Sequence, residues 1–125
     1  MSWDLRGKTA VVTGGASGIG RATCVALARA GCDLVVVDLK AEGMERTKRL
    51  VENEGRLAIT YQVDVSSFAE VQKLADEVAK VGGADVIVNN AGVTVLSDFS
   101  DHSLEDFEWL MGVNFWGVVY GCKAF

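Results

Sequence analysis

The sequence has no proline, one histidine and three cysteines among its 125 residues. Disordered chains are typically rich in proline and poor in apolar residues, whereas half of the residues here are apolar. The composition therefore predicts a folded chain with a core of its own. The cysteines, Cys24, Cys32 and Cys122, are odd in number and lack the spacing of a metal site, so we expect reduced thiols, no metal and a cytoplasmic protein.

Long apolar runs, a signal peptide and a surplus of positive charge are also missing. No apolar stretch approaches the roughly 18 residues that span a bilayer, and residues 1–6 lack the basic-then-apolar layout of a signal peptide. The formal net charge of −5 opposes binding to a phosphate backbone. We therefore expect neither a membrane nor a nucleic acid as partner. The lone histidine, His102, lies in a polar loop and is assigned no catalytic role.

What the sequence does contain is a cluster of glycines between a predicted strand (9–12) and a predicted helix (18–30). The strand is apolar or β-branched without alternation, which is typical of a short buried strand. Four glycines lie at the junction: Gly14, Gly15, Gly18 and Gly20. A strand that breaks and re-forms as a helix aims free N–H groups and the positive end of the helix dipole at one point, which favours a phosphate ligand. Ordinary turns also use glycine, so this pattern alone leaves a plain loop open.

A second buried strand is expected over 33–38, which completes a strand–helix–strand unit. Asp38 ends this strand, 18 residues after Gly20. In such a unit, a carboxylate at this place accepts hydrogen bonds from the ribose hydroxyls of an adenosine and repels a 2′-phosphate. This interpretation predicts NAD rather than NADP, although Lys40 would tolerate a phosphate. A loop aspartate that caps the next helix is the structural alternative.

The rest of the chain alternates predicted helices and strands. Helices are expected over 41–54, over 67–80 and from residue 103 onward, and strands over 57–63 and 84–88. Ser67-x-x-Glu70 and Ser103-x-x-Asp106 have the spacing of capping boxes. One common strand order for such a sheet is 3-2-1-4, and we expect it here, with a ligand crevice where the order reverses. The helical residues expected to face the core are Ile19, Ala22, Val25, Ala26 and the pair Ala28-Arg29, then Met44, Leu50 and Val51, then Val71, Leu74, Val78 and Val81.

Two motifs resemble the short-chain dehydrogenase/reductase family. The first is Thr13-Gly14-x-x-x-Gly18-Ile19-Gly20, and the second is Asn89-Asn90-Ala91-Gly92, directly after the predicted fourth strand. The resemblance covers essentially the whole chain but only the first half of a typical family member. It implies an α/β fold, a Rossmann-type doubly wound parallel sheet truncated after the fourth strand and its following helices. Residues 1–125 would form a single NAD(P)-binding Rossmann domain, incomplete at the C-terminus.

The resemblance also implies roles for particular residues. Asp64 and Val65 would meet the adenine, although an Asx turn that opens the next helix explains the same pair equally well. Asn114 would be catalytic, in a kinked helix whose carbonyl holds a proton-relay water, with a helix cap as its alternative. The implied cofactor-binding residues are Gly14, Ser17, Gly18, Ile19, Gly20, Asp38, Asp64, Val65, Asn90, Ala91 and Gly92.

The reaction implied by the resemblance is hydride transfer between a nicotinamide cofactor and a small alcohol or carbonyl substrate. The family's acid–base group is a Tyr-x-x-x-Lys, and no such spacing occurs in these 125 residues. Tyr120 and Lys123 stand one residue too close, so we interpret Tyr120 as a packing residue and Lys123 as solvated. We therefore expect the 125 residues to be inactive alone, and the intact form to be a homo-oligomer, either a dimer or a tetramer.

Two other classes of protein share parts of the pattern. A short nucleotide-binding protein without catalysis needs only the glycine loop, and a methyltransferase also has glycines after strand one and an acid after strand two. The first is disfavoured by the apolar residues near the end of the chain, such as Phe115 and Trp116, and the second by Asn89-Asn90-Ala91-Gly92. The sequence does not identify the substrate.

Overall fold

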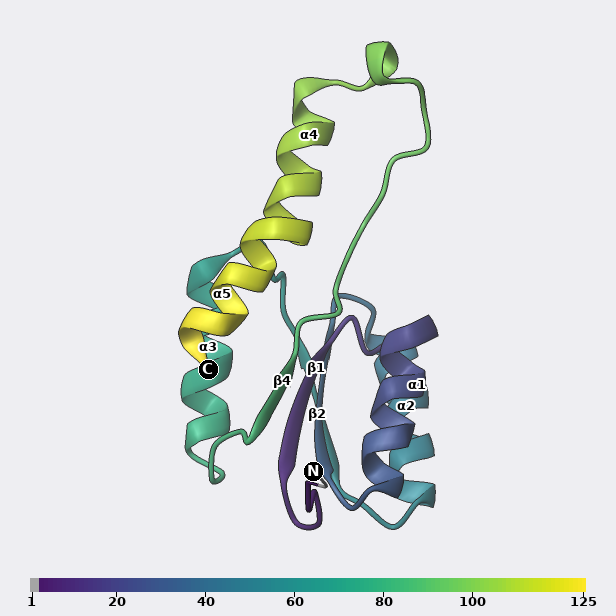
Figure 1. Cartoon of the computed structure of the whole chain (residues 1–125), viewed down its shortest axis with the longest axis vertical. Helices are drawn as coiled ribbons and strands as arrows, with labels where there is room; N and C mark the ends of the chain where they lie inside the picture. Colours follow the sequence, from purple (N-terminus) through teal and green to yellow (C-terminus); the bar gives the residue numbers. More distant parts are fainter. Residues whose placement is uncertain (1–2) are drawn as a thin grey trace.

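A parallel sheet with helices on both faces forms the centre of the molecule in the computed structural model, which describes residues 3–125 (Figure 1). Met1 and Ser2, part of the stretch that we found unlike a signal peptide, lie outside the described residues. The strands are β1 (Thr9–Thr13), β2 (Asp33–Asp38), β3 (Ala58–Gln62) and β4 (Val86–Val88). Their order in the sheet is β3-β2-β1-β4, which confirms the expected order and puts its reversal between β1 and β4.

The central strands are buried because helices cover both of their faces. Val11 of β1 aligns with Val35 of β2 on one side and with Ile87 of β4 on the other. Side chains of β1 and β2 alternate between two apolar clusters, one containing Val12 and Val36 and the other containing Val11 and Val35. This explains why both strands lack the apolar–polar alternation of a sheet with one wet face.

The helices divide between the two faces of the sheet, α1 and α2 on one and α3 and α5 on the other (Figure 1). A long segment, residues 93–103, rises beyond the carboxyl ends of the strands and returns through α4; we call this segment the arm. No helix within residues 3–125 is long and apolar enough to cross a bilayer. The helical elements are α1 (Gly18–Arg29), α2 (Ala41–Asn53), α3 (Phe68–Ala79), the 3-10 turn η1 (Phe99–Asp101), α4 (Leu104–Met111), the π-helical η2 (Gly112–Trp116) and α5 (Gly117–Ala124).

The expected core face of α1 is confirmed only in part: Ala28 is buried, whereas Arg29 is exposed. Ile19 is 78% exposed, and Ala22 and Ala26 are also exposed. The residues that α1 buries are Gly20, Cys24 and Ala28, which lie one turn apart on a single face. This face has the smallest side chains, because the helix begins directly on the strand-to-helix loop and lies close to the strands.

The other two predicted core faces are confirmed in part. Met44 and Val51 of α2 are buried, whereas Leu50 is exposed and Thr47 is fully buried. In α3 the predicted Val71, Leu74 and Val78 are buried. Val81 is 62% exposed, because α3 ends at Ala79 and residue 81 lies in the following turn.

Only one of the two predicted capping boxes is complete. Ser103 accepts a hydrogen bond from the Asp106 N–H, and the Asp106 carboxylate accepts one from the Ser103 N–H, so α4 begins with both bonds. Ser67 accepts from the Glu70 N–H at the start of α3. The Glu70 carboxylate instead accepts a bond from the N–H of Asp64. It therefore ties the end of the β3 segment to α3.

Candidate functional site

The glycine-rich loop between β1 and α1 depends on glycine at three places. Gly14 (φ +67°) and Gly18 (φ +55°) adopt the left-handed region, which residues with a Cβ rarely adopt. A Cβ on Gly20 would collide with the carbonyl oxygen of Gly14, so glycine there lets α1 start directly against the loop. Nothing lies within 4 Å of a Cβ built on Gly18. The loop is therefore open at Gly18 and tightly packed at Gly20.

Ser17, Gly18 and Ile19 form the exposed part of this loop, at the start of α1. N–H groups in the first turn of a helix have no acceptor within the helix and carry the positive end of its dipole. Ser17 is the N-cap residue, and its side chain makes no capping hydrogen bond. The exposed part of the loop is thus a surface of donors suited to an anion.

Thr13 and Asn90 join the ends of β1 and β4 beside the loop. The Asn90 amide donates to the carbonyl oxygens of Thr13 (3.1 Å) and Gly14 (3.3 Å). The Thr13 hydroxyl in turn accepts from the N–H groups of Asn90 and Ala91, both at 3.0 Å. These bonds fix the backbone of Asn90 and Ala91 beside the glycine-rich loop. Thr13 holds this junction and is absent from the implied cofactor-binding residues, although it stands in the motif itself.

Asp38 lies across the loop from Asn90, at the end of β2. One carboxylate oxygen accepts from the N–H of Ala16 (3.1 Å), and the other accepts from those of Leu39 (2.7 Å) and Lys40 (3.2 Å). Lys40, not Asp38, is the N-cap residue of α2, so the helix-cap alternative for Asp38 is wrong. A carboxylate has about four lone-pair sites, and these three bonds leave acceptor capacity toward the cleft.

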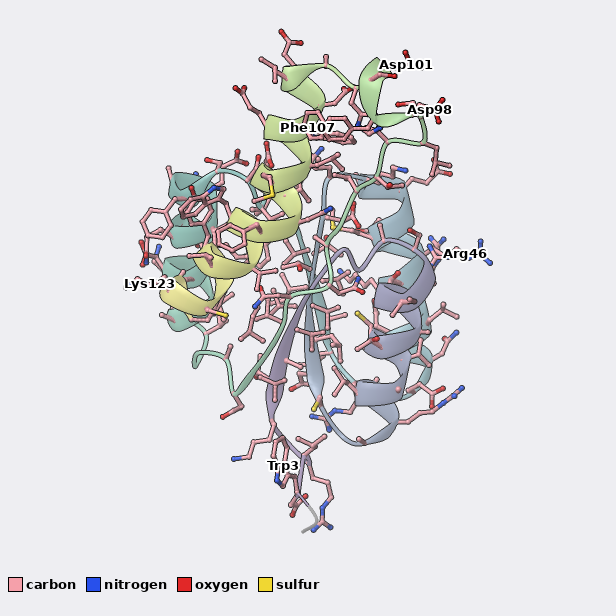
Figure 2. All side chains as sticks on the ribbon, turned by 45° about the horizontal axis from the view of Figure 1, so that its top comes forward. Trp3, Arg46, Asp98, Asp101, Phe107 and Lys123 are labelled. Atoms are coloured by element: carbon pink, nitrogen blue, oxygen red, sulfur yellow. The ribbon has the colours of Figure 1, made fainter. Side chains whose placement is uncertain are left out.

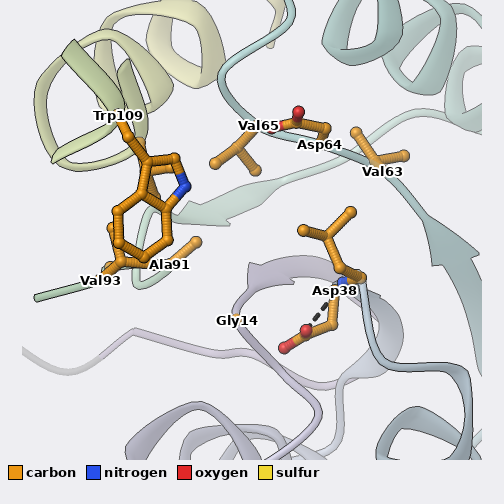
Figure 3. A pocket seen from close by; sticks show the side chains of 11 residues that line it. Gly14, Asp38, Val63, Asp64, Val65, Ala91, Val93 and Trp109 are labelled. Carbon is orange, nitrogen blue, oxygen red and sulfur yellow. Dashed lines mark hydrogen bonds between the residues drawn. The ribbon is translucent and has the colours of Figure 1, made fainter. Parts of the chain in front are cut away.

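A cleft of about 160 Å³ opens at the carboxyl ends of the strands, where the strand order reverses. Figure 3 shows Asp38 on one side of it and the Trp109 ring of α4 on the opposite side, with residues 63–65 along a third. A cavity of about 150 Å³ accommodates one aromatic ring, so this space suits a ring system with a polar group at its edge. The lining residues are Gly14, Asp38, Leu39, Val63, Asp64, Val65, Ala91, Gly92, Val93, Trp109 and Val113.

Asp64 and Val65 follow β3 and line this cleft together. One carboxylate oxygen of Asp64 accepts from both the N–H (2.9 Å) and the hydroxyl (2.6 Å) of Ser66, which is the Asx-type turn expected as the alternative. Val65 is buried, and a Cβ on Gly117 of α5 would lie 2.9 Å from it. Asp64 therefore opens the turn into α3 and faces the cleft at the same time.

Asn114 lies in the π-helical turn η2, within a helical run that continues from α4 into α5. Its side chain accepts a hydrogen bond from the N–H of Val93 and donates one to the carbonyl of Val93, both at 2.8 Å. The helix-cap alternative is therefore wrong, because Asn114 is inside the run and bonds to another segment. The expected irregularity of this helix is present as the π turn.

Trp109 is the main feature of the cleft that the sequence reasoning missed. It stands four residues before Val113, so both project from one helical face, and both line the cleft. That spacing is the only sequence signal for it. Tyr120 packs as expected, with its ring 5.2 Å from that of Phe68. Lys123 is exposed and lies on the outside of α5 (Figure 2).

Cys24 and Cys32 contribute packing rather than reactive groups. Cys24 is fully buried under the loop, and burial raises the pKa of its thiol to about 12. Burial also raises the pKa of Cys32. Among residues 3–125, no three side chains of histidine, cysteine, aspartate or glutamate come together in a metal-binding group.

A parallel sheet with a glycine loop after β1, an acid after β2 and a cleft at the reversal of strand order defines a Rossmann-type fold. The chain belongs to the short chain dehydrogenase family, whose model matches residues 8–125. This assignment sets aside the methyltransferase alternative.

Two relatives with named activities and one relative with a solved structure are similar to this chain over nearly its whole length. A D-threitol dehydrogenase from Mycolicibacterium smegmatis is 39% identical over 125 residues, covering 99% of this chain and 48% of the relative. An L-2,3-butanediol dehydrogenase from Corynebacterium glutamicum is 38% identical over 120 residues, covering 94% and 46%. A short-chain dehydrogenase/reductase from Burkholderia phymatum, solved in complex with NAD, superposes with a TM-score of 0.94 at 36% identity, covering 99% and 44%. The chain thus spans less than half the length of these relatives.

Proposed function

We propose that this chain is the NAD-binding part of an oxidoreductase that transfers hydride between a nicotinamide cofactor and a small alcohol or carbonyl substrate. The observation that carries this proposal is the exposed loop from Ser17 to Ile19, next to a cleft edged by Asp38. The NAD complex of the Burkholderia phymatum relative supports the same choice of cofactor.

The residues present fit the adenosine diphosphate half of such a cofactor. The open space at Gly18 leaves room for a pyrophosphate, and the first turn of α1 offers donors to it. The remaining acceptor capacity of Asp38 suits the ribose hydroxyls and disfavours a 2′-phosphate, so we propose NAD over NADP. Trp109 and Val65 would flank the adenine, with Asp64 at its polar edge. When bound, the nicotinamide supplies the hydride chemistry.

Asn114 is proposed to act on the reaction through the segment that it holds. Its two bonds to Val93 fix the first residue of the arm, directly after Ala91 and Gly92 at the cleft. A loop held in this way gives the substrate side of the cleft a fixed wall. The arm itself ends in acidic side chains, Asp98 and Asp101, at the tip seen in Figure 2.

The substrate class and the assembly are also proposals. The relatives named for D-threitol and L-2,3-butanediol suggest a small polyol or diol as substrate. Exposed aromatic side chains on η2, Phe115 and Trp116, support a homo-oligomer in the intact protein, because large apolar groups in water favour association. We propose a cytoplasmic location from the reduced cysteines.

Titration of the intact protein with NAD+ and NADP+, followed by tryptophan fluorescence, tests the cofactor. We expect tighter binding of NAD+ and a change in emission, because Trp109 lines the cleft. Gly18→Val should weaken NAD+ binding by about tenfold or more, since hydrogen bonds to charged groups are lost. Gly55→Val is the matched control, because Gly55 also has a positive φ (+79°) with nothing within 4 Å, at the far end of α2.

Unchanged NAD+ affinity in Gly18→Val would contradict the phosphate site. A panel of sugar alcohols and vicinal diols, assayed by NADH absorbance, then tests the substrate class. Turnover of simple alcohols without turnover of any diol would contradict that class while leaving the cofactor site intact.

A further inference from the structure

The glycine-rich loop has a buried part as well as the exposed part that faces the anion site. Gly15 and Ala16 are buried, in contrast to Ser17, Gly18 and Ile19. The N–H of Gly15 donates to the Val37 carbonyl of β2 at 3.1 Å. The two carbonyl oxygens of the buried part point elsewhere, and both find side-chain donors.

Thr47 of α2 supplies the first of these donors. Its side chain is fully buried, which is unusual for a polar residue in a helix otherwise rich in charge. Its hydroxyl lies 2.7 Å from the Gly15 carbonyl and 3.2 Å from the Gly43 carbonyl. A hydroxyl has one proton to donate, and the shorter distance assigns that proton to Gly15, a residue 32 positions away in the sequence.

Arg21 of α1 supplies the second donor, and it also donates a hydrogen bond to the hydroxyl of Thr47. Its Nη2 donates to the carbonyls of Ala16 (2.5 Å) and Gly43 (3.2 Å), and its Nε donates to the Thr47 hydroxyl (3.1 Å). Because Arg21 occupies the acceptor side of that hydroxyl, the hydroxyl proton is directed to Gly15. None of the ion pairs formed by residues 3–125 involves Arg21, so its charge stays beneath the loop without a carboxylate partner.

The approach of α2 to the loop is close enough to require this arrangement. A Cβ on Gly43 would lie 2.6 Å from the Ala16 carbonyl oxygen, so only glycine lets α2 come this near. The Asp38 carboxylate receives the Ala16 N–H on the other side. Both polar groups of the Ala16 backbone are therefore bonded to side chains, immediately before the exposed part begins.

We propose that Arg21 and Thr47 are positioning residues that hold the buried part of the loop, and through it aim the N–H groups of Ser17 to Ile19 at the pyrophosphate of the cofactor. The inference rests on the proposed function and extends it to two residues that do not line the cleft. Thr47 is fully buried, and the Arg21 guanidinium is bonded to Thr47 and to backbone carbonyls of the loop and α2. Their effect should therefore fall on the phosphate-bearing part of the ligand alone.

Calorimetric titrations of the intact protein with NAD+, ADP and adenosine test this proposal. Thr47→Val keeps the shape of the side chain and removes the hydroxyl. We expect it to weaken binding of NAD+ and ADP by about five- to thirtyfold, the usual effect of losing a buried hydrogen bond, and to leave adenosine binding unchanged. Thr47→Ser restores the hydroxyl and should bind all three ligands as the wild type does. Thr60→Val on β3, which removes a hydroxyl bonded to Glu45, is the control.

A second variant keeps the proposal testable if Thr47→Val does not fold. Arg21→Lys at a half-buried position keeps the charge and loses the planar fork, and we expect the same selective loss for NAD+ and ADP. Equal weakening of all three ligands would overturn the proposal, because it would indicate general disruption of the site, and so would wild-type affinity in both variants. Wild-type protein that binds none of the ligands would instead overturn the proposed function itself.

Discussion

The loop side of the cleft and the arm side are built in different ways. On the loop side, α1 and α2 bury Cys24, Met44 and Thr47 against the strands, and the loop itself is bonded by side chains from both helices. On the arm side, α4 has no buried residue, and Trp109 is 48% exposed even though it lines the cleft. The contrast is between a wall fixed by many internal contacts and one fixed by few.

The loop side of the cleft is held in place by packing between the loop, the strands and two helices, whereas the arm side is not. The geometry at Gly14 and Gly20 follows from close contacts within the loop and with Asn90, so it resists change. The arm is held at its first residue by two hydrogen bonds between Asn114 and Val93, and near its tip by ring contacts of Phe99 and His102 with Phe107. Changes on the loop side should therefore alter stability and cofactor binding, whereas changes on the arm side should alter local motion.

The largest expected effect is a loss of stability when one methyl group is added on the loop side of the cleft. Gly20→Ala places a Cβ against the Gly14 carbonyl oxygen, so the start of α1 must shift, and we expect a loss of about 3 kcal/mol in the free energy of unfolding. Gly112→Ala is the matched change on the arm side, where a Cβ would meet only the Ser66 Cβ at 3.4 Å. It should be neutral or stabilising by about 0.5 kcal/mol, because alanine favours a helix over glycine. Urea denaturation of both variants measures the difference, and equal losses would contradict the contrast.

The next effect concerns Asp38, which accepts a hydrogen bond from the Ala16 N–H of the loop and also lines the cleft. Asp38→Ala removes the acceptor of the Ala16 N–H and the group proposed for the ribose, so NAD+ affinity should fall by about tenfold. The protein's preference for NAD+ over NADP+ should become smaller, because the charge that repels a 2′-phosphate is gone. Asp38→Asn keeps an oxygen for Ala16 while removing the charge, and it separates the two roles. Titration with both cofactors decides, and equal affinities in the wild type would remove the basis of the NAD assignment.

A smaller effect is expected on the arm side. Asn114→Ala loses both bonds to Val93, so local opening of the arm should become easier by about 1–2 kcal/mol. Amide hydrogen exchange should accelerate over residues 93–103 and stay unchanged over β1 and β2. Asn114→Asp, which keeps only the acceptor for the Val93 N–H, should lie between the wild type and the alanine variant. Faster exchange throughout the sheet would show that the arm is not an independent unit.

The smallest expected effect is a difference in thiol reactivity between the buried Cys24 and Cys32 and the exposed Cys122. Because burial raises the pKa of Cys24 to about 12, its thiolate fraction at pH 8 is on the order of 1 in 10,000. Cys24 and the buried Cys32 should stay unlabelled by a thiol reagent at pH 8, whereas the exposed Cys122 of α5 should react. Labelling of Cys24 should begin only near pH 12 or on unfolding. Mass spectrometry of the labelled protein reads the sites directly.

The sequence predicts the fold and the loop well because both rest on local patterns. Buried parallel strands are apolar throughout, as at Val35 to Val37, and glycines mark turns that other residues cannot make. The strand order and the contacts of Asn90 follow from motifs with fixed places in such a sheet.

The parts that escaped prediction depend on distances between elements. Thr47 looks like a surface residue of a charged helix, and its burial becomes evident only once Gly43 brings α2 against the loop. Ile19 looks like a core residue, but it belongs to the exposed part of the loop at the start of α1. Trp109 reaches the cleft from a helix that follows the long arm, and no local pattern specifies where that helix returns.

The π turn from Gly112 to Trp116 sets the rotational phase between two parts of one helical run. Each residue of an α-helix turns the chain by about 100°, so a wider turn lets α5 point its side chains independently of α4. Trp109 can therefore lie toward the cleft while Tyr120 packs at a tilt against Phe68 of α3. Removing one residue from this turn would restore a regular helix and swing all of α5 out of register with α3. The π turn therefore changes the direction in which the side chains of α5 point around the helix axis.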